Sequence, residues 1–177
     1  AFISGTGIFF PKTTLTLDNY LKITNRLREK EGQNERLIEF SSRVNRNMAI
    51  SSRRTIHPAW GSEGHINADE IEDILTPYNF NPPFYLRMKL WAKYAPKLAL
   101  GAAKEALASW AGNSDCITHV VTGTTTGWCE PGIASYLVDN LELSEHCQKT
   151  EINFNGCFAG MTCLRMAREL VKACPGR

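Results

Sequence analysis

An α/β fold is predicted by three observations on this sequence of 177 residues. From residue 93 onward, segments with helical spacing of apolar residues alternate with β-branched segments, a pattern typical of crossover units on a parallel or mixed sheet. Hydrophobic residues make up 43% of the chain and charged residues 21%, as in ordinary globular domains. The chain is also long enough to bury a sizeable core. Disordered, collagenous and coiled-coil classes are therefore excluded.

Charge and hydropathy argue against a nucleic-acid partner and against a membrane protein. Twenty Lys and Arg stand against 18 Asp and Glu, a net charge of +2, whereas nucleic-acid binding requires a strong basic excess on one face. No apolar run approaches the ~20 residues of a membrane-spanning helix, and the first residues do not resemble a secretory signal. The six cysteines include no CxxC pair, so we expect a reduced, cytoplasmic protein.

Residues 1–92 are predicted to form an irregular helical region that precedes the α/β core over residues 93–177. The expected elements of the first region are a strand over 2–11, a helix capped by Asp18, a helix from Glu35 to about Met48, a short helix over 69–75 and a loop over 76–84. Gly5-Thr6-Gly7 lacks the third glycine of a dinucleotide-binding fingerprint, and Pro11 follows it instead of a helix. Tight backbone packing is therefore the favoured interpretation of these glycines.

The core region contains five predicted elements. They are a helix with Pro96 in its first turn, a strand over 117–122, a helix over 132–141, a strand over 151–154 and a helix over 158–173. The last helix is predicted to bury an apolar stripe made of Met161, Leu164, Ala167 and Val171. Its Arg165, Arg168 and Lys172 are predicted to face water.

Cys157 is the most informative residue because it lies where a predicted strand ends and a long helix begins. The free N–H groups and partial positive charge of a helix N-terminus favour a thiolate, which is the nucleophilic form of cysteine. Gly156 would allow the sharp turn before it, and Gly160 would allow close helix packing. A packed, inert thiol is the alternative, since cysteine is among the most buried residue types. That alternative is favoured for Cys116, Cys147, Cys163 and Cys174.

Two further features allow a functional and a structural interpretation. The segment 122–127, Thr-Gly-Thr-Thr-Thr-Gly, follows a predicted strand, and ligands of open α/β sheets bind at such carboxyl ends. A threonine-rich turn with self-bonding hydroxyls is equally consistent. Arg43, Arg46, Arg53 and Arg54 form either a solvated basic face or an anchor for a phosphorylated cofactor. No metal site is expected, because His57, His65 and His146 have no partners at ligand spacing. Cys116 and His119 would point to opposite faces of a strand.

Several of these segments together resemble the chalcone synthase-like type III polyketide synthases. The matching motifs are Ile117-Thr118-His119-Val120-Val121, Thr125-Thr126-Gly127-x-x-x-Pro131-Gly132, Gly156-Cys157-Phe158-Ala159-Gly160 and Leu164-Arg165-x-Ala167. Weaker matches are Tyr20–Asn25, Arg53-Arg54 and Pro96-Lys97-Leu98. The resemblance is strongest from about Pro96 onward.

The resemblance implies a thiolase-like fold of two similar halves, a homodimer, and an acyl transfer that involves a cysteine. Such an enzyme loads an acyl group from an acyl-coenzyme A and extends it by decarboxylative condensation with malonyl-coenzyme A; the thioesters are substrates, and no cofactor is bound. By position, Cys157 would be the acyl-accepting nucleophile, and Thr125 and Thr126 would line the acyl pocket. Glu130 stands where plant members have a methionine that reaches the neighbouring subunit. Arg46 would contact the coenzyme A phosphates.

The chain also departs from the family pattern. Glu130 in place of methionine, together with Trp128, Cys129 and the segment 153–155, differs from plant members, which argues against a flavonoid-type product. Family members are much longer, and their catalytic histidine and asparagine lie in the second half. We therefore expect residues 1–177 to be the amino-terminal half, with the carboxyl-terminal half absent. The alternatives are a ketoacyl synthase III-like condensing enzyme and a half-length, non-catalytic binding or dimerisation paralogue.

Overall fold

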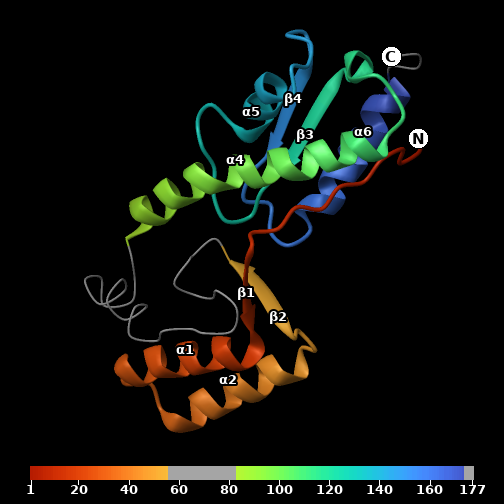
Figure 1. Cartoon of the computed structure of the whole chain (residues 1–177). Coiled ribbons are helices and arrows are strands. Elements are labelled where there is room, and N and C mark those ends of the chain that lie inside the picture. Colours follow the sequence, from red (N-terminus) through yellow and green to blue (C-terminus); the bar gives the residue numbers. More distant parts are fainter. Residues whose placement is uncertain (56–82, 174–177) are drawn as a thin grey trace. The chain divides into compact units, whose positions relative to one another are not determined.

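The computed structural model describes residues 1–55 and 83–173, and the chain divides into two compact units. The first unit contains Ala1–Phe9 and the chain from Phe84 onward; the second contains Phe10–Pro83. Figure 1 shows the helices and strands of both. The helix predicted over 69–75, most of the loop predicted over 76–84, and Cys174 lie outside the described residues. The expected subdivision at residue 92 falls within a helix that spans Phe84–Ser109.

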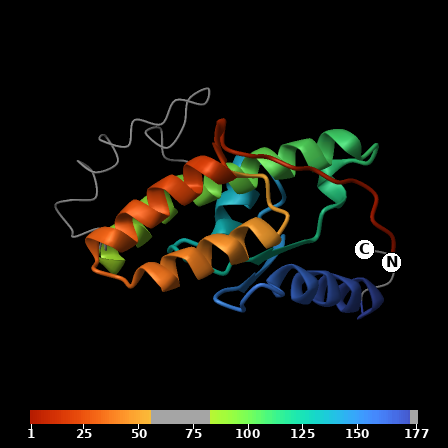
Figure 2. The same ribbon diagram turned by 90° about the horizontal axis from the view of Figure 1, so that it is seen from below.

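The second unit is a helical hairpin with a small antiparallel sheet. Helices α1 (Leu17–Lys30) and α2 (Glu35–Asn47) lie side by side (Figure 2), and strand β1 (Thr13–Thr16) pairs with β2 (Ser52–Thr55). The helix predicted from Glu35 is confirmed. The core of this unit consists of Leu15, Leu21, Ile23 and Ile38, each less than a tenth exposed.

The cap predicted for the first helix is wrong by two residues. The hydroxyl of Thr16 accepts a hydrogen bond from the backbone N–H of Asn19 at 3.3 Å, so Thr16 is the N-cap of α1. Asp18 lies inside the first turn, where its negative charge still interacts favourably with the helix dipole. Both residues are good capping types, and the chain uses the one whose extended backbone ends β1.

The predicted strand over 2–11 is also wrong. Residues 1–11 form no strand; instead residues 1–9 run along α4 (Phe84–Ser109). The backbone N–H of Thr6 donates to the hydroxyl of Ser109 at 2.9 Å, and that of Ile8 donates to the Glu105 carboxylate at 3.0 Å. A Cβ added to Gly5 would lie 2.5 Å from the carbonyl oxygen of Ala106. The tight packing predicted for the glycines is confirmed. The segment packs on a helix, however, and its backbone N–H groups bond to side chains of that helix and not to a neighbouring strand.

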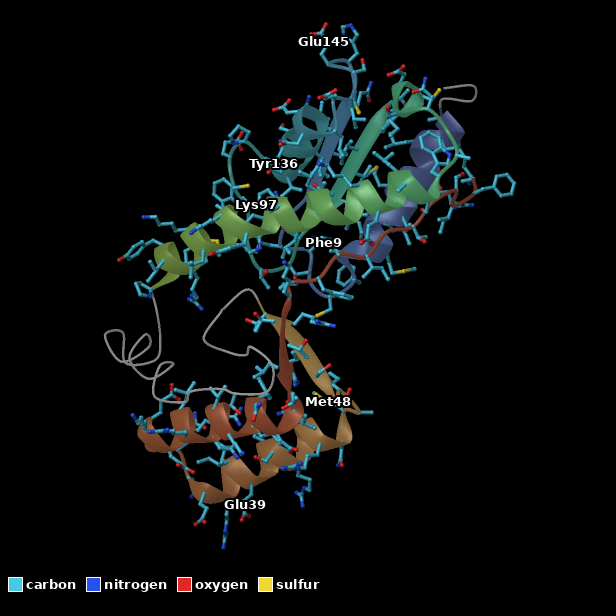
Figure 3. The ribbon with its side chains drawn as sticks, viewed as in Figure 1. Phe9, Glu39, Met48, Lys97, Tyr136 and Glu145 are labelled. Carbon is cyan, nitrogen blue, oxygen red and sulfur yellow. The ribbon has the colours of Figure 1, made fainter. Side chains whose placement is uncertain are left out.

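Helix α4 begins twelve residues before Pro96, which therefore lies in its interior rather than in its first turn. Proline has no N–H to donate to the carbonyl group of Ala92. The helix nevertheless continues through this point, and Pro96 is buried. Phe9 lies against the same helix, with its ring over Gly101 (Figure 3). Tertiary packing has overridden the usual position of proline at a helix start.

A parallel crossover unit forms the centre of the first unit. Strand β3 (His119–Gly123), helix α5 (Ile133–Asn140) and strand β4 (Gln148–Ile152) follow one another, and the two strands pair in parallel. This arrangement confirms the predicted order of strand, helix and strand, but β4 begins three residues earlier than the strand predicted over 151–154 and ends two residues earlier. On the face covered by α5, Val138, Leu143 and Cys147 form a buried cluster against which Val120 packs.

Helix α6 (Ala159–Ala173) covers the other face of the β3–β4 pair, as Figure 1 shows. A Cβ added to Gly123 of β3 would lie 2.6 Å from the sulfur of Cys163, so the two elements pack closely. The stripe predicted to be buried is wrong in large part. Met161 is 69% exposed, Leu164 is 52% exposed and Val171 is 54% exposed. Periodicity correctly predicts the apolar face of a helix, but the described part of this chain does not cover it.

Among the described residues, no helix combines the length and apolar character needed to cross a bilayer.

Candidate active site

The carboxyl ends of β3 and β4 meet at one edge, and Thr124 joins them. Its backbone N–H donates to the carbonyl oxygen of Ile152 at 2.9 Å. Its hydroxyl lies 2.7 Å from the carbonyl oxygen of Gly127 and 2.9 Å from the side-chain oxygen of Asn153, and it can donate to either. Because one hydroxyl carries one proton, it cannot donate to both oxygens at once. The loops that follow the two strands are thus held together at the edge where open α/β sheets bind ligands.

The turn between β4 and α6 has an unusual backbone. Phe154 has a φ of 54° and Gly156 a φ of 76°, both in the left-handed region that most side chains disfavour. The hydroxyl of Thr162 donates to the side-chain oxygen of Asn155 at 3.0 Å, and the N–H of Ala159 donates to the carbonyl oxygen of Gly156 at 3.0 Å. The positive φ of Gly156 agrees with the sharp turn predicted for it.

Cys157 lies in this turn, two residues before the start of α6, and its thiol is free and exposed. Gly160 does not provide the close packing predicted for it, since an added Cβ would meet nothing within 4 Å. The first turn of α6 is therefore open on that side. An exposed thiol just before the start of a helix can attack an electrophile that approaches from solvent.

The remaining described cysteines differ from Cys157 in burial or in place. Burial raises the pKa of Cys129, Cys147 and Cys163 above the ordinary value of 9.0, which disfavours the reactive thiolate. At Cys129 the nearby carboxylates of Glu151 and Glu130 raise the pKa further. Cys116 is exposed, but it precedes β3 and so lies near the amino end of that strand. Of these five, only Cys157 is both exposed and at the carboxyl edge.

The other predicted site residues are divided between the two units. Thr125, Thr126 and Glu130 are exposed in the loop between β3 and α5, and the Thr124 bonds bring this loop to the one that follows β4. Arg46 lies on α2 in the other unit, where its guanidinium is 3.1 Å from the Asp18 carboxylate. Both side chains are more than half exposed. The binding roles of these four residues stay predictions.

Four site residues were missed by the sequence reasoning: Asn153, Asn155, Thr162 and Glu151. The first three hold the loops around Cys157, as described above. The Glu151 carboxylate accepts a hydrogen bond from the backbone N–H of Ala134 at 2.7 Å, which fixes α5 against β4. The only sequence signal was the pair of asparagines beside Gly156, since Asn and Gly are typical turn residues.

A groove of about 600 Å³ lies beside the site rather than in it. Apolar residues of α4, β3 and α6 line it, among them Leu107, Val121 and Leu170. None of the predicted site residues is among its lining residues. Among the described residues, no group of three or more His, Cys, Asp or Glu side chains is placed to hold a metal ion.

Comparison with known proteins places the chain in a family. The family model "Chalcone and stilbene synthases, N-terminal domain" matches residues 68–177. A probable polyketide synthase 1 of Dictyostelium discoideum is 29% identical over 99% of this chain and 5% of its own length. A bisdemethoxycurcumin synthase of Oryza sativa subsp. japonica is 38% identical over 51% of this chain and 23% of its own length.

Solved structures agree with these sequence matches. The C-terminal type III polyketide synthase domain of Steely1, a type I/III hybrid from Dictyostelium, has a TM-score of 0.73 at 25% identity, over 98% of this chain and 44% of that one. The fold of PKS-I from the brown alga Ectocarpus siliculosus is also similar, with a TM-score of 0.78 at 24% identity, over 99% and 45%.

The predicted fold class and family are thereby confirmed: the fold is α/β and thiolase-like. The chain spans less than half the length of each of these four proteins. The chain belongs to the chalcone and stilbene synthases, the type III polyketide synthases, and corresponds to their N-terminal region.

Proposed function

We propose that this chain supplies the acyl-accepting nucleophile of a polyketide-forming condensing enzyme, and that the nucleophile is Cys157. The observation that carries the proposal is the position of this exposed thiol, at the joined carboxyl edge of β3 and β4 and just before α6. Family membership supports it from the sequence. Cys129, Cys147 and Cys163 are poorer candidates, because their partial or full burial raises the pKa of each thiol and disfavours the thiolate.

The proposed reaction has two steps. First, the Cys157 thiolate attacks the carbonyl carbon of an acyl-coenzyme A, the bond from that carbon to the coenzyme A sulfur breaks, and the released coenzyme A thiolate takes a proton from water. Second, malonyl-coenzyme A loses carbon dioxide, and the resulting carbanion attacks the acyl group on Cys157. A carbon–carbon bond forms, the bond to sulfur breaks, and the Cys157 thiolate is restored. Coenzyme A thioesters are the substrates, and the reaction requires no bound cofactor.

The binding residues are proposed by their position in the family pattern. Thr125 and Thr126 would line the acyl pocket, and the backbone bond from Thr124 to Ile152 holds the start of their loop at the end of β4. In a homodimer, Glu130 would place a carboxylate where plant members have a methionine that reaches the neighbouring subunit, so this contact would be polar. Arg46 would bind a coenzyme A phosphate, in which case the phosphate would compete with Asp18 for its guanidinium.

Acyl transfer to Cys157 provides the test. The polypeptide that carries this sequence is first weighed by denaturing mass spectrometry, which also shows whether a second chain accompanies it. It is then incubated with a panel of acyl-coenzyme A thioesters and digested. We expect an acyl adduct on the Cys157 peptide, lost in Cys157→Ala and retained in Cys116→Ala. If no thioester of the panel labels that peptide, the chain does not supply the nucleophile, and a binding or dimerisation role becomes the better explanation.

The extender distinguishes the two condensing-enzyme classes. Product formation with free malonyl-coenzyme A supports a type III polyketide synthase. Dependence on a carrier-protein thioester would favour a ketoacyl synthase III-like enzyme instead.

A further inference from the structure

Two side-chain contacts hold the turn that carries Cys157, one on each side of Phe154. On one side, Asn153 contacts the hydroxyl of Thr124, in the loop after β3. On the other, Asn155 accepts the hydrogen bond from Thr162, one turn into α6. The Thr162 hydroxyl also lies 3.4 Å from the carbonyl oxygen of Phe158, but its closer partner is Asn155. The turn is thus tied both to the sheet edge and to the helix.

The backbone of this turn requires such support. A non-glycine residue in the left-handed region costs of order 1 kcal/mol or more, and Phe154 has a φ of 54°. Left-handed backbone persists only where its surroundings determine it. The side chain of Phe154 does not provide this, because it is 51% exposed. The polar contacts of its two asparagine neighbours hold the turn, together with the backbone bond from Ala159 to Gly156.

The Asn155–Thr162 bond fixes the turn relative to the helix. Asn155 precedes Cys157 by two residues and Thr162 follows it by five, so their bond closes a loop around the thiol. Both residues are half-buried, which shields the bond from water and makes its loss costly. Thr162 is the partner on the rigid element, since its N–H donates to the carbonyl oxygen of Phe158 within the helix start.

We propose that Asn155 and Thr162 are positioning residues that hold the Cys157 sulfur in line for acyl transfer, an inference that rests on the proposed function. Attack on a bulky thioester requires the sulfur and the carbonyl carbon to be aligned, and small misplacements slow such reactions strongly. Alkylation by iodoacetamide, a small reagent free in solution, requires only that the thiol be accessible. A positioning role therefore affects the first reaction and leaves the second unchanged.

The experiment compares the two rates at Cys157 in the same preparations of the polypeptide that carries this sequence. The test variants are Thr162→Val and Asn155→Leu, and the conservative variant is Thr162→Ser. The matched control is Thr24→Val, which removes the hydroxyl that donates to the carbonyl oxygen of Tyr20 at 2.9 Å within α1. Acylation is followed by mass at increasing acyl-coenzyme A concentration, which separates the maximal rate from the half-saturating concentration.

We expect Thr162→Val and Asn155→Leu to lower the maximal acylation rate about fivefold, the effect of one hydrogen bond lost from the transition state. The half-saturating concentration and the iodoacetamide rate at Cys157 are expected to stay unchanged. Thr162→Ser keeps the hydroxyl and is expected to restore the rate, whereas Thr24→Val is expected to match the unsubstituted protein.

Each other outcome overturns the inference in a recognisable way. If the unsubstituted protein acylates Cys157 and the test variants do so equally fast, the inference fails and the proposed function stands. If acylation and alkylation slow together, Thr162 and Asn155 act only by maintaining the fold. If the unsubstituted protein is not acylated, both proposals fail, because the turn then has no reacting thiol to position.

Discussion

The side chain of Glu151 caps a helix that precedes it in the sequence. Its carboxylate accepts the backbone N–H of Ala134 at 2.7 Å, in the first turn of α5. Gly132, the N-cap residue of that helix, makes no side-chain hydrogen bond, and a Cβ there would run into the Glu151 carboxylate. Because Gly132 has no side chain, the Glu151 carboxylate of β4 has room to cap the helix in its place. A negative charge at this end also interacts favourably with the helix dipole.

Glu151→Ala is therefore expected to destabilise the protein by about 1 kcal/mol, as loss of a helix N-cap does. Urea unfolding monitored by circular dichroism measures the change. Glu145→Ala is the control because the Glu145 side chain is 89% exposed, and surface changes of this kind have little effect. Equal stabilities of the two variants would show that the Glu151 contact contributes nothing.

Two glycines are expected to respond oppositely to alanine. A Cβ at Gly7 would collide with the backbone of Ala102 and Ala106, so Gly7→Ala should destabilise the protein by about 1–3 kcal/mol. A Cβ at Gly160 meets nothing within 4 Å, and alanine is favoured over glycine in helices by about 1 kcal/mol. Gly160→Ala should therefore stabilise the protein. Thermal unfolding of both variants tests the pair, and the same sign for both would contradict the packing described.

The thiol of Cys147 makes the free energy of unfolding depend on pH in the alkaline range. Burial raises its pKa above 9.0, and the charge of Lys149 offsets this only in part. The folded protein therefore keeps this proton after the unfolded chain has lost it. The corresponding stability is fully present below pH 9.0 and is lost as the pH rises through the higher folded pKa. Cys147→Ala removes the titrating group, although it also weakens packing in the buried cluster.

The free energy of unfolding, measured from about pH 8 to about pH 10, should fall more steeply for the unsubstituted protein than for Cys147→Ala. The difference between the two should thus narrow with increasing pH. Parallel pH profiles would show that Cys147 has the same proton affinity in the folded and unfolded states.

The second unit should depend strongly on Leu15. This side chain is 2% exposed, and truncation of a buried leucine costs about 2–5 kcal/mol. Leu37 of α2 is 53% exposed, so Leu37→Ala is the matched control and should change stability little. Denaturant unfolding of both variants measures the difference. A small effect of Leu15→Ala would mean that β1 does not pack on the helices as described.

Local structure could be predicted from the sequence where the pattern of apolar residues agreed with the packing of the folded protein. The apolar spacing over 132–141 predicted α5, and the β-branched run before Gly123 predicted a strand. Both predictions succeeded because the apolar side chains of these segments pack against each other in the folded protein. Pro96 misled because its usual place at a helix start is a local preference, which the packing of α4 overrides. The strand predicted over 2–11 failed because its glycines bring the backbone onto a helix.

The candidate site could be predicted only in part. Cys157 could be chosen as a candidate because the sequence shows both the end of a strand and the start of a helix around it. The contacts of Thr124 with Asn153 and of Glu151 with Ala134 join residues separated by 29 and 17 positions. No periodicity encodes such pairs. The burial of α6 was also misjudged, since an apolar face does not indicate which part of a protein covers it.

The bonds of Thr124 have a consequence for the order in which the protein folds. They link the ends of two parallel strands between which the chain must first complete a helical crossover. Such non-local pairings form late, because loop closure has to precede them. Until these pairings form, the loops around Cys157 lack the contacts that join them at the end of the two strands. The edge beside Cys157 is therefore complete only when the whole crossover unit has folded.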